Sequence, residues 1–82
     1  MPHEANIGGL SFGEAQKAMA RGLCVARTGW NGKDMWIAQQ NPDEHSKMTL
    51  PYYYMRTVQG DLVPWLASQT DMLKTDWTVV RG

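Results

Sequence analysis

The stretch Ser11–Arg27, SFGEAQKAMARGLCVAR, decides how this chain folds, because it contains a helix start, a helix end and the beginning of a strand. Ser11 and Glu14 have the spacing of a capping box, in which each side chain accepts a hydrogen bond from the backbone N–H of the other residue. Gly22 is the residue type that most easily takes the left-handed conformation after a last helical turn. The pattern therefore predicts a helix over residues 12–21.

One face of this predicted helix is apolar. Four apolar side chains recur on it at spacings of three and four residues, namely Phe12, Ala15, Ala18 and Met19. A helix with such a stripe packs it against another element of the same domain. The short apolar run at residues 23–27 follows directly and ends before Thr28 and Gly29, so it predicts the first strand.

The rest of the chain completes the pattern of a small α+β domain. Further strands are predicted over residues 35–38, 52–58, 62–63 and 77–80, and a short helix is predicted to begin at Ser68 or Thr70. Hairpin-length connections favour an α+β fold with a small antiparallel β-sheet packed with one N-terminal helix and a short C-terminal helix. Residues 1–10 are expected to be a flexible leader, and residues 11–82 a single domain.

The length and the cysteine content limit how such a domain is stabilised. A chain of 82 residues has a modest core. Cys24 is alone, so it forms no intrachain disulfide, and no Cys and His spacing typical of a metal site is present. We therefore expect no metal and no cofactor, and self-association is the remaining means of stabilisation.

The charge pattern argues against large polyanionic partners. Eight basic and eight acidic residues give a net charge of zero and form no runs, so neither DNA nor RNA is an expected partner. No apolar run approaches the roughly 20 residues that span a bilayer, and the N-terminal residues lack the apolar core of a signal peptide. The sequence predicts a cytoplasmic protein with no membrane partner.

No residue pattern predicts catalysis. His3 falls in the expected leader and His45 in a polar loop, so neither is placed as a positioned base. Cys24 is expected to be a small core residue. Asp71 and Asp76 are more simply a capping carboxylate and a turn residue than an acid and base pair. We expect no catalytic residues and no enzymatic activity.

Aromatic residues with polar neighbours favour a binding function instead. Trp36 and Trp77 are expected in the core, whereas Trp30 lies in a turn and Trp65 precedes a polar helix start. The polar residues near these last two suit the base, ribose and phosphate groups of a small nucleotide: Arg27, Asn31, Ser68, Gln69 and Asp71. Tryptophan is also a common core residue, so a protein-interaction module with an aromatic surface is the alternative.

Four motifs together resemble a known phage protein family. They are SFGEA at 11–15, VARTGWNGKDMW at 25–36, VPWLASQTDML at 63–73 and DWTVV at 76–80. In this order they resemble the Thoeris anti-defence 2 proteins, long catalogued only as a domain of unknown function. The resemblance extends from Ser11 to Val80.

The resemblance implies a sponge for a signalling nucleotide. Proteins of that family bind, without cleaving it, a cyclic ADP-ribose isomer such as glycocyclic ADP-ribose, which a bacterial TIR-domain enzyme makes during infection. The downstream effector is then not activated. Family members form homotetramers with ligand pockets between protomers, and some also bind cyclic dinucleotides at separate sites. The expected location is the cytoplasm of the infected bacterial host.

Carried onto this chain, the resemblance implies two walls of a pocket. Trp30 would stack on the adenine or line the pocket, with Asn31 beside it, and Arg27 would face a phosphate. The opposite wall would be the segment from Trp65, whose polar side chains would meet ribose or phosphate groups or hold the loop in shape: Ser68, Gln69 and Asp71. Residues 41–51 depart from the longer insert expected of the family, which leaves the choice of ligand open. A nucleotide hydrolase that uses the same pocket is a further alternative.

Overall fold

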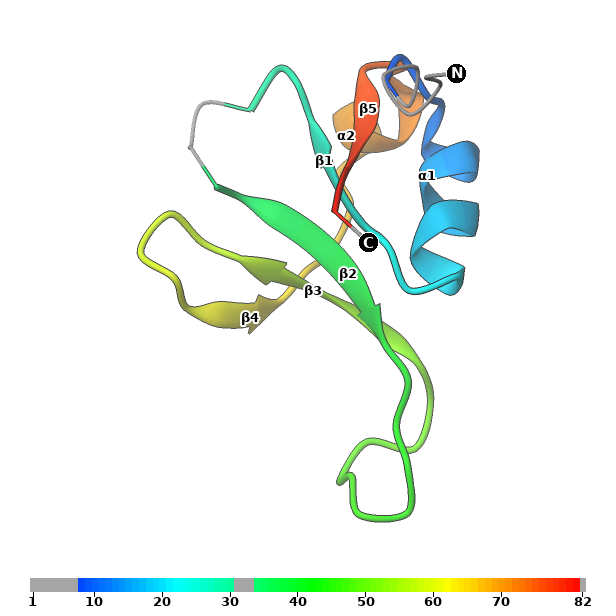
Figure 1. The fold of residues 1–82 in the computed structure, drawn as a ribbon, viewed down its shortest axis with the longest axis vertical. Coiled ribbons are helices and arrows are strands. Elements are labelled where there is room, and N and C mark those ends of the chain that lie inside the picture. Colours follow the sequence, from blue (N-terminus) through cyan, green and yellow to red (C-terminus); the bar gives the residue numbers. More distant parts are fainter. Residues whose placement is uncertain (1–7, 31–33, 82) are drawn as a thin grey trace.

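The structure, a computed structural model, describes residues 8–30 and 34–81. Its elements, in chain order, are α1 (Phe12–Ala20), β1 (Cys24–Arg27), β2 (Trp36–Gln40), β3 (Tyr52–Arg56), β4 (Leu62–Pro64), α2 (Gln69–Leu73) and β5 (Trp77–Arg81). The strands form one antiparallel sheet in the order β4-β3-β2-β1-β5. This is the predicted α+β fold (Figure 1). No helix among the described residues has the length and apolarity needed to cross a bilayer.

Helix α1 begins and ends for the reasons that its sequence indicates. The Ser11 backbone N–H donates to Glu14 Oε1 at 2.8 Å, and the Glu14 N–H donates to Ser11 Oγ at 3.2 Å, which completes the capping box. Gly22 has a φ of 93°, so its left-handed conformation ends the helix without a Cβ clash. The helix stops at Ala20, one residue before the predicted end, because Arg21 is its C-cap.

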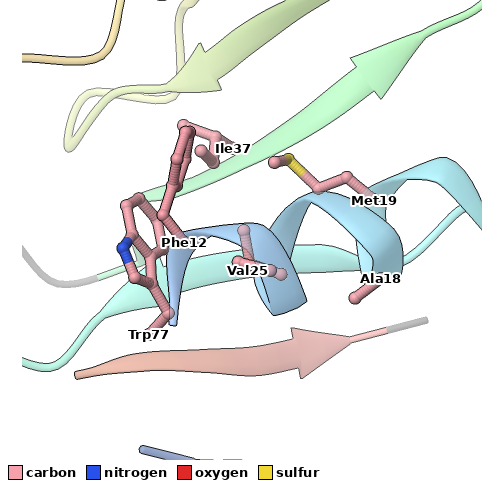
Figure 2. Close-up of a cluster of buried hydrophobic side chains, with 7 residues drawn as sticks. Phe12, Ala18, Met19, Val25, Ile37 and Trp77 are labelled. Carbon is pink, nitrogen blue, oxygen red and sulfur yellow. The ribbon is translucent and has the colours of Figure 1, made fainter. Parts of the chain in front are cut away.

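The core lies between α1 and one face of the sheet. The strand registers place Val25 opposite both Ile37 and Val79, so one row of apolar side chains crosses the central strands. Side chains alternate between the two faces of a strand, so this row faces α1 throughout. Figure 2 shows Met19 of α1 extending toward Ile37, with Phe12 and Trp77 at the other end of the cluster. Together these residues form the hydrophobic core.

The N-terminal boundary of the domain lies before Ser11. Leu10 and Trp77 exchange two backbone hydrogen bonds, with N–O distances of 2.8 and 3.2 Å. The Leu10 side chain also packs against the core. Leu10 was assigned to the leader and belongs instead to the fold. Residues 1–7 of the expected leader lie outside the described residues.

The second face of the sheet carries aromatic side chains that α1 does not cover. Trp36 lies there and packs edge-on against Tyr54, with ring centroids 6.0 Å apart. Its neighbour Ile37 points to α1 and is fully buried, so the alternation of the strand directs Trp36 the other way. The expectation that Trp36 is a core residue is wrong, whereas Trp77, which is 0% exposed, is confirmed in the core.

The row under α1 sets the stability of the domain, so removing its central side chain should be costly. We expect Ile37→Ala to lower the free energy of unfolding by about 2–4 kcal/mol, because it leaves a cavity below the helix. Urea unfolding followed by tryptophan fluorescence measures this loss. Val58→Ala, in an exposed turn, serves as the control and should change the free energy by less than about 0.5 kcal/mol. Equal effects of the two substitutions would contradict this description of the core.

Candidate ligand-binding site

Three of the four tryptophans meet at the end of the sheet where β5 begins. We call Phe12, Trp30, Trp65 and Trp77 the tryptophan cluster. The ring centroids of Trp30 and Trp65 lie 5.5 and 6.1 Å from that of Trp77, both in edge-to-face contact. The Phe12 ring lies 5.2 Å from Trp77. Contacts of this geometry contribute about 0.5–1.5 kcal/mol each beyond the area that they bury.

The cluster has a buried base and a half-exposed outer part. Trp77 is fully buried, and its Nε1–H donates to the Asp71 carbonyl at 3.0 Å, so its polar group is satisfied. Trp30 and Trp65 are half-buried and lie 6.4 Å apart. The backbone N–H of Trp65 donates to the Tyr53 carbonyl at 3.1 Å, which extends the pairing of β4 with β3 by one hydrogen bond. The two outer indoles form an aromatic wall at one end of the domain.

Beside this wall, one arginine holds two carboxylates, and we call Arg27, Asp71 and Asp76 the Arg27 network. Arg27 Nη1 donates to Asp71 Oδ1 at 2.8 Å, and Arg27 Nε donates to Asp76 Oδ1 at 2.9 Å. The side chains of Arg27 and Asp71 are only 11% and 15% exposed. A guanidinium with two carboxylate partners in partly buried surroundings is strongly fixed in place.

Asp71 has a second partner, because its side chain also helps to cap the start of α2. The Asp71 N–H donates to Ser68 Oγ at 3.1 Å, and the Ser68 N–H donates to Asp71 Oδ2 at 3.2 Å. These two bonds form a capping box at Ser68, one of the two caps that the sequence suggests. Ser68 and Asp71 therefore shape the segment that follows Trp65, which is the structural alternative considered for Asp71.

The electrostatics keep all three network groups charged at neutral pH. Burial alone would raise the pKa of Asp71, but hydrogen bonds from Arg27 and Ser68 outweigh it and hold that pKa below its ordinary value. The hydrogen bond from Arg27 is the main cause that lowers the pKa of Asp76. The hydrogen bonds that Arg27 donates to Asp76 and Asp71 raise the pKa of Arg27. The network thus has a net charge of −1, and its arginine is already neutralised.

The structure brings together five of the seven predicted site residues, namely Arg27, Trp30, Trp65, Ser68 and Asp71. Gln69 lies exposed in the first turn of α2, and Asn31 lies outside the described residues. Arg27 was expected to face a phosphate, and the structure gives it two carboxylates. Asp76 belongs with these residues and was not predicted as part of the site. The sequence feature that could have indicated Asp76 is its position directly before Trp77, a residue expected in the core.

Two pockets of the described surface lie away from the tryptophan cluster. A pocket of 450 Å³ is lined by Asp34, Met35, Trp36, Arg56 and Val80, on the face of the sheet away from α1. A second pocket of 220 Å³ is lined by Gln40, Met48, Tyr52, Tyr54, Leu62, Val63 and Pro64. Neither is lined by the tryptophan cluster. In the described part of one chain, the cluster presents Trp30 and Trp65 as a half-exposed wall, separate from these two pockets.

The described residues also show where the other reactive side chains lie. His45 is highly exposed in the loop between β2 and β3, 3.4 Å from Glu44. Cys24 is half-buried at the start of β1. Over residues 8–30 and 34–81, no group of three or more His, Cys, Asp and Glu side chains is arranged to hold a metal ion.

Fold and site together define a small α+β domain with an aromatic wall that an ion-paired arginine braces. Residues 10–80 match the Thoeris anti-defense 2-like domain. A relative, Thoeris anti-defense 2 of Bacillus phage SP01, is 31% identical over 84 residues, which cover 87% of this chain and 94% of the relative. The chain therefore belongs to the Thoeris anti-defense 2-like family, as its four motifs predict.

The lowered pKa values give a pH dependence of known sign. Both carboxylates ionise more readily in the folded than in the unfolded chain, so their contribution to stability is complete above the unfolded pKa of about 3.9. It is lost as the pH falls through the folded values. Arg27→Met should flatten the loss of stability on acidification, because the charge that favours ionisation is gone.

Urea unfolding between pH 7 and pH 2.5 measures this dependence. Arg21→Met, which removes an exposed arginine at the end of α1, is the matched control and should keep the wild-type profile. At pH 7, Arg27→Met should also lower the free energy of unfolding by about 1–3 kcal/mol, since two partly buried carboxylates lose their partner. A profile of Arg27→Met that overlays that of the wild type would exclude the network as the source of acid sensitivity.

Proposed function

We propose that this protein is a phage anti-defence sponge. It binds a cyclic ADP-ribose-derived signalling nucleotide of the glycocyclic ADP-ribose type and sequesters it without cleaving it. In the cytoplasm of the infected bacterial host this keeps the effector of TIR-domain immunity inactive. Membership of the Thoeris anti-defense 2-like family supports the anti-defence role. The observation that carries the ligand assignment is the half-exposed wall of Trp30 and Trp65.

The wall has the chemistry that a purine nucleotide needs. An indole face stacks on any base, and one such contact contributes about 1–3 kcal/mol in single-stranded nucleic acid complexes. Trp30 and Trp65 are fixed from below by Trp77, so they lose little side-chain freedom when a ligand arrives. Gln69 follows Trp65 by four residues and is exposed, so it supplies an amide group for ribose oxygens, whereas the Ser68 hydroxyl is bound to Asp71.

The carboxylates of the site favour binding over hydrolysis. A hydrolase that uses this wall would need Asp71 or Asp76 as its general base. Both are ion-paired with Arg27, and both have a lowered pKa, which makes each a weak proton acceptor near neutral pH. The geometry therefore supports a site that holds the nucleotide intact.

The chemistry of the phosphates supports a site that two protomers share. Arg27 is neutralised by its two carboxylates, so a doubly phosphorylated ligand needs cations from another source. Leu66, which precedes α2, is 92% exposed, and Leu73, the last residue of α2, is 80% exposed. Apolar side chains this exposed are suited to contact with another chain. We propose a homotetramer in which a neighbouring protomer completes each pocket, and cyclic dinucleotides are a second ligand class to test.

Ligand recovery tests the function directly. The purified protein is mixed with cyclic ADP-ribose isomers and cyclic dinucleotides and filtered, and the retained protein is then heat-denatured. Mass spectrometry of the released material should find an intact cyclic nucleotide. A cleaved product would contradict the sponge and favour a hydrolase. Retention of no small molecule would favour the protein-interaction module.

Trp30→Ala should abolish retention while the fold persists, because the stacking surface is lost. Trp36→Ala is the matched control, since it removes a half-exposed indole from the opposite face of the sheet. It should retain ligand as the wild type does. Isothermal titration of both variants measures the difference, and circular dichroism verifies that each is folded. If Trp36→Ala lost the ligand and Trp30→Ala retained it, the ligand would lie in the 450 Å³ pocket beside Trp36.

The oligomeric state is a separate prediction. Light scattering should give a mass about four times the 9.3 kDa of one chain. Leu66→Asp should reduce the mass and weaken nucleotide binding together, because it places a charge in the proposed contact. Val58→Asp, in an exposed turn away from α2, should change neither. A wild-type protein that is monomeric at micromolar concentration would exclude a shared pocket.

A further inference from the structure

We propose that Asp76 is a positioning residue that fixes the turn carrying Trp30 against α2. Its carboxylate binds Arg27 and Gly29, and its place in the sequence predicts only a turn residue. This inference rests on the proposed function, because it concerns how the same wall is held. The argument starts from the hydrogen bonds that Asp76 accepts.

Asp76 holds the turn through several groups at once. Its Oδ2 accepts from the Gly29 backbone N–H at 3.0 Å and from Thr28 Oγ1 at 3.5 Å, while Oδ1 accepts from Arg27 Nε at 2.9 Å. The Asp76 carbonyl also accepts from the Thr28 N–H at 3.0 Å. Three consecutive residues before Trp30 are therefore fixed to one residue that lies nearly fifty positions later in the chain.

The turn itself is closed immediately before the indole. The Trp30 N–H donates to the Arg27 carbonyl at 3.2 Å, so the backbone reverses within four residues. A Cβ at Gly29 would lie 3.0 Å from Asp76 Oδ2 and 3.3 Å from Arg27 Nη2. A side chain at this position would therefore push the Asp76 carboxylate or the Arg27 guanidinium aside by a few tenths of an ångström. The backbone of the turn and the Asp76 side chain are fitted to each other.

The Asp76 carboxylate is also connected to α2, through Arg27. Arg27 Nη1 binds Asp71, which caps α2 together with Ser68, and the Asp71 carbonyl binds the indole N–H of Trp77. Asp76 therefore joins the Trp30 turn to the helix that follows Trp65. A wall held in its binding conformation before the ligand arrives has less freedom to lose, which raises affinity.

Asp76→Asn tests this role because it keeps the shape of the side chain and removes its charge. We expect it to weaken binding of glycocyclic ADP-ribose about tenfold by isothermal titration. Ser46→Ala is the control, since loss of the hydrogen bond from the Asp43 N–H to Ser46 Oγ costs about 0.5–1 kcal/mol in the β2–β3 loop, which bends away from the helices (Figure 1). It should leave affinity unchanged. Gly29→Ala, which crowds the carboxylate, should weaken binding as Asp76→Asn does.

A second readout needs no ligand. In ¹⁵N spectra of Asp76→Asn without nucleotide, the Gly29 amide should lose protection from hydrogen exchange and the Trp30 indole resonance should shift. The Trp36 indole, on the other face of the sheet, should stay in place. Ser46→Ala should move neither the Gly29 nor the Trp30 signal. A merely stabilising role of Asp76 would affect the two indoles alike.

The two readouts separate the inference from the function on which it rests. If the wild type binds no cyclic ADP-ribose isomer, the proposed function fails, and the spectra alone decide the role of Asp76. Unchanged Gly29 and Trp30 signals in Asp76→Asn would overturn the inference. Equal losses of affinity in Asp76→Asn and Ser46→Ala would also overturn it, because the effect would then follow global stability.

Discussion

The burial of the Trp77 indole is the interaction on which the rest of the structure depends. Its ring touches those of Phe12, Trp30 and Trp65, its N–H is bonded to the carbonyl of Asp71, and its backbone pairs with the segment before α1. Truncation of a buried aromatic residue of this size costs about 3–5 kcal/mol. In a domain of 82 residues that is a large part of the total stability. One side chain thus connects the first helix, the turn after β1 and α2.

The sheet separates two aromatic environments that the sequence does not distinguish. The face toward α1 is closed by the helix and carries the tryptophan cluster at one end. The other face carries Trp36 and Tyr54, and α1 does not cover it. The bend of the long β2–β3 connection away from the helices is plain in Figure 1. Binding at the cluster and binding in the pocket beside Trp36 are therefore physically separate, and substitutions can test each independently.

The ion pairs of the Arg27 network determine what the polar residues beside the tryptophans can do. As free groups, an arginine and two aspartates near an aromatic wall would suit a phosphate, a ribose and a proton transfer. Paired as they are, with distances of 2.8 and 2.9 Å, they neutralise most of one another's charge and hold the wall in shape. A ligand gains from such a network through the rigidity of the site, and the charges that meet its phosphates come from elsewhere.

The sequence by itself determined the local structure and the family. The capping boxes at Ser11 and Ser68 and the glycine at position 22 depend on neighbours within a few residues, so their spacing is enough to predict both helices. The face of Trp36 and the partners of Arg27 were decided only by the tertiary structure. Asp71 and Asp76 lie 44 and 49 residues after Arg27 in the chain. Only the pairing of β1 with β5 brings them close to it. Spacing along a chain encodes contacts within one turn, whereas contacts between distant segments require the strand register to be known.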